Sequence, residues 1–256
     1  MPTYNSPALD KGLDILEFLS SQSIPQSQSE IGSGINRKPN EIYRMLVCLE
    51  ERGYIRKEPI SGKYQLTLRL FQLSHHHSSI DYLVKAAMPY LEQLSEAILQ
   101  SCHLSFFYRN KLLILCQAKS MTPISLSVEV GGVFPITQTN SGKIILANKS
   151  ESERKQILNA SEDFQQLSNA EKIHLEKELT TLKDLKCFVQ KSTLTEGVTD
   201  FASPVYDINN EVMAVLVVSG LTSQLKNASQ KGIIKEILKT VDGINVSIGG
   251  VSRDKK

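Results

Sequence analysis

The residues whose chemistry is easiest to interpret lie between positions 37 and 63. Arginine and lysine carry charges that attract phosphate groups, and arginine and asparagine side chains can each make paired hydrogen bonds to the edge of a base. Arg44 and Asn40 are therefore predicted to contact base edges. The residues predicted to hold phosphates are Arg37, Lys38, Tyr43, Arg56 and Lys63.

A helix followed by a hairpin must position these side chains. Apolar residues recur at helical spacing from Ile42 to Leu49, which predicts a helix over residues 39–52 that ends at Gly53. Two shorter helices are predicted before it, near residues 7–19 and 27–31. The order of three helices and a hairpin is typical of a winged helix-turn-helix, whose third helix enters the DNA major groove. Its N-terminal N–H groups suit a phosphate. The hairpin strands are expected at residues 54–58 and 63–67.

Simpler interpretations of the same residues remain open. Arg37 and Lys38 could serve only to keep a loop soluble, and Arg44 could pair with Glu41 or Glu51. Glu41 itself could cap its own helix as the third residue or accept a hydrogen bond from a cytosine amino group, and capping is the favoured alternative. Asn36 precedes this helix and tolerates a left-handed turn conformation.

Charge is distributed unevenly along the chain. The 256 residues include 29 Lys and Arg and 27 Asp and Glu, which gives a net charge of +2 and by itself does not suggest nucleic acid. Residues 36–69 alone carry a net charge of +4, whereas the stretch from residue 75 to the end carries +1. The surplus is therefore concentrated on the predicted third helix and hairpin.

Composition excludes several classes of protein. Apolar residues make up 41% and charged residues 22%, as in ordinary globular proteins. No apolar run is long enough to span a membrane, and we expect a cytoplasmic protein without a membrane partner. The four cysteines lie far apart with no C-x-x-C spacing, which argues against a zinc ribbon or a redox pair. No cofactor is expected.

The remainder of the chain predicts a second, larger domain. We expect a winged helix-turn-helix at 1–67, a helical linker at 68–79 that includes three consecutive histidines, and an α+β domain with an antiparallel sheet at 80–250. Its helices are expected at 80–99, 141–148, 151–158, 169–185 and 225–248. Its strands are expected at 102–108, 112–118, 125–130, 134–136, 188–191, 201–207 and 212–218.

Several motifs together resemble the IclR family of transcriptional regulators. In the first domain they are Leu9-Asp10-Lys11-Gly12-Leu13-Asp14-Ile15-Leu16, Ile42-Tyr43-Arg44-Met45-Leu46, Leu49-Glu50-Glu51-Arg52-Gly53-Tyr54-Ile55 and Gly62-Lys63-Tyr64-Gln65-Leu66. In the second they are Ala87-Met88-Pro89-Tyr90-Leu91, Leu126-Ser127-Val128-Glu129-Val130-Gly131, Asn140-Ser141-Gly142-Lys143, Glu196-Gly197-Val198-Thr199-Asp200 and Val217-Val218-Ser219-Gly220. Each motif alone is weak, but in this order they cover nearly the whole chain.

The resemblance implies a DNA-binding regulator with a GAF-like effector domain, acting as a homodimer or tetramer on double-stranded operator DNA. A small effector, expected to be an organic acid, would change its affinity for DNA, and no catalysis is implied. Gly142 would let the ligand approach the helix start closely. Asp200 would repel an acidic ligand unless a cation or a metal intervenes, which argues against a simple two-carbon or three-carbon acid. The implied pocket residues are Asn140, Ser141, Gly142, Gln190, Asp200, Val217 and Ser219.

His103 and Cys102 raise alternative functions. A neutral His103 facing inward could contact a ligand or share a metal with Asp200, although a core histidine is the commoner case and no metal site is predicted. Neighbouring residues on a strand point to opposite faces, so Cys102 and His103 can hardly act as a nucleophile and base. A further alternative is a sensor or scaffold protein whose winged helix binds protein. Lys143 is interpreted as a surface charge on its helix.

Overall fold

The chain divides into two units between residues 78 and 79 in the computed structural model. The structure describes residues 6–75, 79–183, 185–225 and 230–250. None of the described helices is both long enough and apolar enough to cross a membrane.

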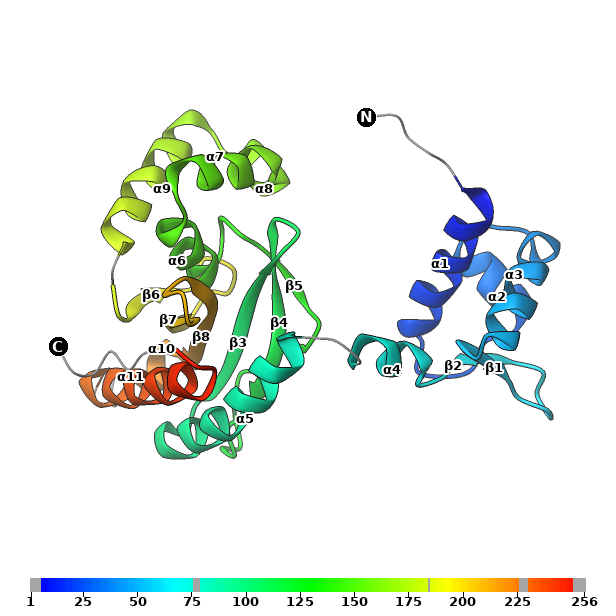
Figure 1. Ribbon diagram of the computed structural model, residues 1–256, viewed down its shortest axis with the longest axis horizontal. Coiled ribbons are helices and arrows are strands. Elements are labelled where there is room, and N and C mark those ends of the chain that lie inside the picture. Colours follow the sequence, from blue (N-terminus) through cyan, green and yellow to red (C-terminus); the bar gives the residue numbers. More distant parts are fainter. Residues whose placement is uncertain (1–5, 76–78, 184, 226–229, 251–256) are drawn as a thin grey trace. The chain divides into compact units, whose positions relative to one another are not determined.

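The first unit contains three helices, a hairpin and a fourth helix (Figure 1). Side chains from the first three helices and both strands meet in one apolar core, which includes Ile15, Ile31, Ile42 and Tyr64. The predicted winged helix-turn-helix order is therefore confirmed. The elements are α1 (Pro7–Ser20), α2 (Gln28–Gly34), α3 (Pro39–Glu51), β1 (Ile55–Lys57), β2 (Tyr64–Leu66) and α4 (Arg69–His75).

Local sequence signals explain where α2 and α3 begin and end. Ser27 and Glu30 form a capping box at the start of α2, in which each side chain bonds the backbone of the other. Asn36 turns the chain between α2 and α3 with a φ of 54°, the left-handed conformation expected for it. Gly53, with a φ of 74°, follows the end of α3 in the same region of backbone space.

A six-stranded antiparallel sheet forms the centre of the second unit, with strand order β5-β4-β3-β8-β7-β6. The predicted α+β class is therefore confirmed. Asp207 and Asn210 close the turn between β7 and β8, where the backbone N–H of Asn210 donates to the Asp207 carbonyl at 3.1 Å. The strands are β3 (Ser101–Tyr108), β4 (Lys111–Ala118), β5 (Val133–Pro135), β6 (Phe188–Lys191), β7 (Val198–Tyr206) and β8 (Val212–Leu221).

Helices cover both faces of this sheet (Figure 1). On one face α5 (Ser79–Ile98) and α11 (Gln230–Ser247) enclose a core around Leu91, Leu104 and Phe201. On the other face α6 (Asn140–Asn148) packs through Ile144 and Ile145. The remaining described helices lie beyond α6 or next to β8: α7 (Glu151–Ala160), α8 (Glu162–Gln165), α9 (Asn169–Leu182) and α10 (Thr222–Leu225).

One predicted strand is absent. Residues 125–130 alternate apolar and polar side chains, but the structure places no strand there. Strand β5 pairs only with Lys111–Leu113 of β4. Beside the later part of β4, the Ser127 hydroxyl donates to the Gln117 side chain at 3.0 Å, and alternation of side chains without a ladder of backbone hydrogen bonds does not make a strand. The expected helix at 225–248 includes residues 226–229, and the histidine tract of the linker includes His76 and His77; these positions lie outside the described residues.

Candidate functional site

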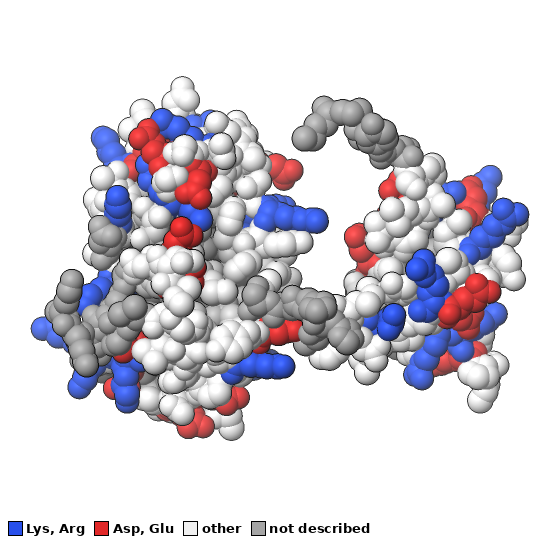
Figure 2. Space-filling view, in the orientation of Figure 1, with Lys and Arg blue, Asp and Glu red and all other residues white. Residues whose placement is uncertain are grey.

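Helix α3 presents a polar face to solvent. Ile42 and Leu46 are fully buried against the core of the first unit, whereas Asn40, Tyr43 and Arg44 are exposed. Because Tyr43 and Arg44 follow Asn40 by three and four residues, the three side chains lie on neighbouring positions of one helix face. Figure 2 shows basic side chains on the surface of the first unit, interspersed with acidic ones.

The start of α3 is held by contacts that the sequence did not reveal. The Gln28 side chain of α2 donates through Nε2 to the Pro39 carbonyl at 2.8 Å, which ties the two helices together. Arg37 and Lys38 lie exposed immediately before Pro39, the first helical residue. At this N-terminus Pro39 has no N–H group, and the N–H of Glu41 donates to the Lys38 carbonyl at 2.9 Å.

The favoured role of Glu41 is wrong. Helix α3 has no side-chain capping bond at its N-cap residue, Lys38. Glu41 instead forms an ion pair with Lys11 of α1, with 3.7 Å between Nζ and Oε2. Glu41 is exposed, so its side chain is free to turn either to the backbone at the start of its own helix or to Lys11, and it contacts Lys11. In the described part of the chain Arg44 forms no ion pair with Glu41 or Glu51.

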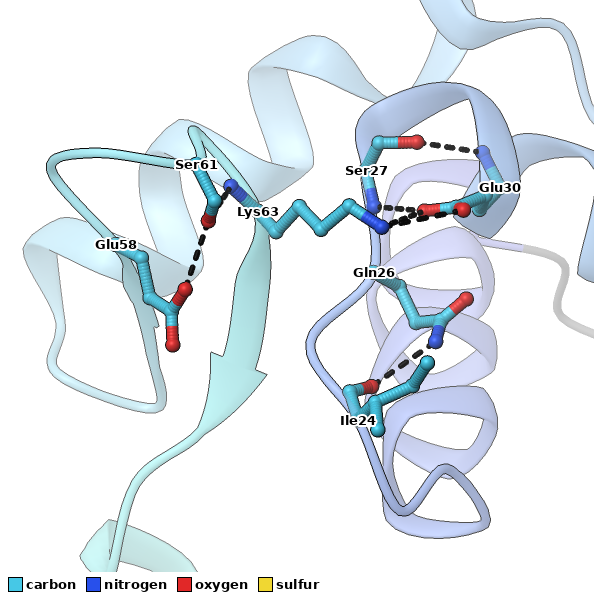
Figure 3. A network of polar contacts seen from close by, with 7 residues as sticks. All are labelled: Ile24, Gln26, Ser27, Glu30, Glu58, Ser61 and Lys63. Carbon is cyan, nitrogen blue, oxygen red and sulfur yellow. Dashed lines mark hydrogen bonds and ion pairs between the residues drawn. The ribbon is translucent and has the colours of Figure 1, made fainter.

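The hairpin wing is attached to the start of α2 (Figure 3). Lys63 on the wing lies 3.2 Å from Oε2 of Glu30, and Glu30 also accepts from the backbone N–H of Ser27 at 2.6 Å. The backbone N–H of Ser27, then its hydroxyl and then Lys63 lower the pKa of Glu30 to about 2. Tyr64 and Gln26 exchange two backbone hydrogen bonds beside this pair, at 2.7 and 2.9 Å.

These contacts change what is expected of Lys63. Its ammonium group already contacts a carboxylate, so a phosphate would have to share or displace Glu30. Arg56 remains an exposed residue of β1. The sequence signal for Glu30 was present in the S-x-x-E spacing of a capping box, but its second contact, to the wing, depends on tertiary structure.

The second unit contains a cavity of about 240 Å³ beside α6. Its walls come from strands β3, β4, β5, β7 and β8, the N-terminus of α6 and the segments around residues 126–128 and 192–195. Five of the predicted residues line it: Asn140, Ser141, Asp200, Val217 and Ser219. The other lining residues are His103, Ser105, Leu112, Ile114, Leu126, Ser127, Val128, Phe134, Thr139, Ser192, Leu194, Thr195 and Val198.

Asp200 is the centre of a hydrogen-bond cluster in this cavity. Ser219 donates to its Oδ1 at 2.7 Å, and Asn140 donates through Nδ2 to its Oδ2 at 3.0 Å. Burial raises the pKa of Asp200, and hydrogen bonds from Ser219, Asn140 and Ser192 oppose that rise. The cluster forms because Asp200 and Ser219 are directly opposite on β7 and β8.

His103 and Cys102 lie on opposite faces of β3, as alternation predicts. His103 lines the cavity, and burial lowers its pKa to about 4, so the imidazole is neutral near pH 7. Cys102 belongs to the opposite core, where its Sγ donates to the Leu91 carbonyl at 3.2 Å and burial raises its pKa to about 12. Within the described ranges, no group of three or more His, Cys, Asp or Glu residues could hold a metal ion.

Two predicted pocket residues do not line the cavity. Gln190 is directly opposite Asp200 on β6, and its buried Oε1 has no hydrogen-bond partner. Gly142 is needed for helix packing, because a Cβ atom there would lie 1.9 Å from the Ile136 carbonyl oxygen. The expected close approach to Gly142 is therefore made by the protein's own backbone.

We expect Gly142→Ala to lower the melting temperature, because the new methyl group must displace the Ile136 carbonyl and hence the start of α6. Overpacking of this kind costs about 1–3 kcal/mol. Gly12→Ala in α1 is the control, since nothing lies within 4 Å of its added Cβ. Thermal unfolding followed by circular dichroism compares the two, and equal stability of Gly142→Ala and the wild type would contradict the packing role.

Lys143 is buried, contrary to its interpretation as a surface charge. It is only 6% exposed, and its Nζ lies 3.0 Å from Oε1 and from Oε2 of Glu178 on α9. Helix α9 covers the side of α6 from which Lys143 projects, and the sequence of α6 alone could not reveal this.

The comparison with protein families covers both units. Residues 8–59 match the IclR helix-turn-helix domain, and residues 75–246 match the bacterial transcriptional regulator IclR C-terminal domain. The chain is 24% identical to the DNA-binding transcriptional repressor YiaJ of Escherichia coli K12, over 97% of this chain and 90% of that protein. It is also 24% identical to the regulator BhcR of Paracoccus denitrificans, over 86% of this chain and 80% of BhcR.

Solved structures show the same fold. An IclR homologue from Microbacterium hydrocarbonoxydans, crystallised with 4-hydroxybenzoate, has a TM-score of 0.78 at 18% identity and covers 94% of this chain and 99% of its own. Thermotoga maritima IclR has a TM-score of 0.72 at 20% identity, covering 94% and 98%. With both domains matched in order, the chain belongs to the IclR family of bacterial DNA-binding transcriptional regulators.

Proposed function

We propose that this chain binds promoter DNA in the cytoplasm through α3 and that a small molecule in the cavity beside α6 changes its affinity. The observation that carries the DNA-binding site is the exposed face of α3, where Asn40, Tyr43 and Arg44 follow the basic residues Arg37 and Lys38. Asn40 and Arg44 contact base edges, and Tyr43 and the flanking cations contact phosphates.

The effector part of the proposal is supported by the cavity. Its 240 Å³ can hold a small metabolite, and it combines apolar walls with a few converging polar groups. The homologue from Microbacterium hydrocarbonoxydans was crystallised with an aromatic acid. We propose an organic effector with an acid group for this chain too, bound without a cofactor and without turnover.

The test is binding of the full chain to a fluorescent duplex from the region upstream of its own gene. We expect the dissociation constant to rise steeply with salt, because each phosphate contact releases a counterion. Adding an effector should change that constant at fixed salt. Absence of salt-sensitive binding to any such duplex would favour the alternative, in which the winged helix binds a protein.

Dimerisation would bring two α3 helices to two half-sites, and exposed apolar side chains support it. Leu9 is 59% exposed and Leu13 47%, one turn apart on α1, and Phe71 on α4 is 59% exposed. We expect Leu9→Asp with Leu13→Asp to shift the chain toward monomer in sedimentation velocity. Ile60→Asp at the wing, where the isoleucine is fully exposed, is the matched control. An unchanged oligomer in the double variant would exclude α1 from the interface.

A further inference from the structure

The acceptor groups around Asp200 determine which chemical group of a ligand can be placed there. Asp200 accepts hydrogen bonds from Ser219 at 2.7 Å and from Asn140 at 3.0 Å, with a further one from Ser192. A carboxylate can only accept, so it orients these three side chains with their donors toward itself. Their acceptor atoms are thereby left for the ligand.

Asn140 shows this effect most clearly. Its Nδ2 is committed to Asp200, and its Oδ1 is buried with no hydrogen-bond partner although the residue lines the cavity. Asn140 as a whole is only 4% exposed, so its unpaired Oδ1 lies in a largely desolvated position at the cavity wall. A buried acceptor without a partner costs about 1–3 kcal/mol, which a ligand that donates to it would recover.

Ser105 adds a second unsatisfied group to the same cavity. Its hydroxyl is buried without a partner, and the residue is 1% exposed. No lysine or arginine is among the residues that line the cavity, and Asp200 is its one acidic residue. The described lining therefore offers no side-chain cation to balance a carboxylate placed beside Asp200.

We propose that the cavity selects an effector that presents a hydrogen-bond donor, such as a hydroxyl, to Asp200 and Asn140, and that excludes ligands with a carboxylate at this position. This inference rests on the proposed function, because it specifies the effector of the same pocket. An acid binds only if its carboxylate lies elsewhere.

The test uses two matched series of ligands with the full chain in isothermal titration calorimetry. The aromatic series is 4-hydroxybenzoate, 4-methoxybenzoate and terephthalate, which exchange one hydroxyl for a methyl ether or a second carboxylate. The aliphatic series is xylonate, its fully methylated ether and xylarate. In the series that fits the cavity, we expect the hydroxylated mono-acid to bind at least tenfold more tightly than its two analogues.

Asp200→Asn provides the second readout. Its amide can donate a hydrogen bond and carries no charge. The dissociation constant of the dicarboxylate, divided by that of the hydroxylated mono-acid, should therefore fall by tenfold or more, and the hydroxylated mono-acid itself should bind more weakly than it does to the wild type. Glu196→Gln is the matched control, an exposed carboxylate of the same unit outside the cavity lining. The control should keep the wild-type order of affinities.

Three results would overturn the inference. They are a dicarboxylate that binds the wild type as tightly as the hydroxy acid, an ether that binds as tightly as the hydroxyl, and no binding by any member of either series. If Asp200→Asn does not fold, the wild-type series still decides the outcome. A hydroxylated ligand that binds more tightly than its ether and its dicarboxylate analogue could still leave the affinity for DNA unchanged. That result would contradict the proposed regulation, but it would support the inferred preference of the cavity for a hydrogen-bond donor.

Discussion

Arg44→Ala should weaken binding to the cognate promoter duplex by about 1–3 kcal/mol for each half-site, which is roughly 5- to 150-fold. The guanidinium is exposed on α3 and lies one turn after Asn40, and we propose that both side chains contact base edges in a major groove. Its removal leaves the core residues Ile42 and Leu46 untouched. The loss should therefore appear in affinity and not in stability.

The form of the loss distinguishes a base contact from a phosphate contact. If Arg44 contacts a base, Arg44→Ala should flatten the preference at one operator position and leave the salt dependence nearly unchanged. A phosphate contact would instead reduce the salt slope by about one and weaken all sequences alike. Fluorescence anisotropy over a range of salt concentrations and a set of single-base operator variants provides both measurements.

Arg52→Ala is the control for this experiment. Arg52 is also exposed and caps the opposite end of α3, so it has the same charge on the same helix without the position near the groove. We expect a much smaller effect. Wild-type affinity in Arg44→Ala, or an equal loss in Arg52→Ala, would contradict the assignment of the N-terminal half of α3 to base contacts.

The largest loss of stability is expected from Lys143→Ala. This change leaves the Glu178 carboxylate without its partner in a place where only 14% of the Glu178 side chain is exposed. Breaking a buried pair from one side costs about 3–5 kcal/mol. Because α6 begins at the cavity, loss of this pair should also weaken effector binding.

A hydrophobic replacement separates the charge from the packing. The double variant Lys143→Met with Glu178→Leu removes both charges and retains most of the volume, so it should recover much of the lost stability. Lys155→Ala is the surface control, since Lys155 and Glu151 form a pair whose side chains are 66% and 71% exposed. That change should cost well under 1 kcal/mol. Urea unfolding followed by circular dichroism suits a chain without tryptophan, and equal losses in both single variants would contradict the buried pair.

The sequence predicted those features that depend on neighbours along the chain. Helical spacing from Ile42 to Leu49 identified α3, and Gly53 marked its C-terminal end. The left-handed turn at Asn36 before α3 was compatible with the backbone preference of asparagine. Alternation placed Cys102 and His103 on opposite faces of β3. These are short-range effects, since backbone geometry and side-chain periodicity operate within a few residues.

Side-chain partners were predicted less well. Glu41 was expected to cap its own helix and instead pairs with Lys11, and Lys143 was expected at the surface and instead pairs with Glu178. Residues 125–130 alternate as a strand does but form no strand, although the Ser127 hydroxyl donates to the Gln117 side chain of β4. In each case the outcome depends on which distant element packs nearby, and spacing along the chain carries no such information.

The amino-acid sequence by itself determined the order of elements, the basic segment between residues 36 and 69 and the resemblance to a regulator family. Only the tertiary structure decided the chemistry of the cavity. It brings Asn140, Asp200 and Ser219 within hydrogen-bond distance across three elements. The physical reason is that hydrogen-bond partners and desolvation depend on distances through space. A single carboxylate orients its neighbours only after folding has placed them around it.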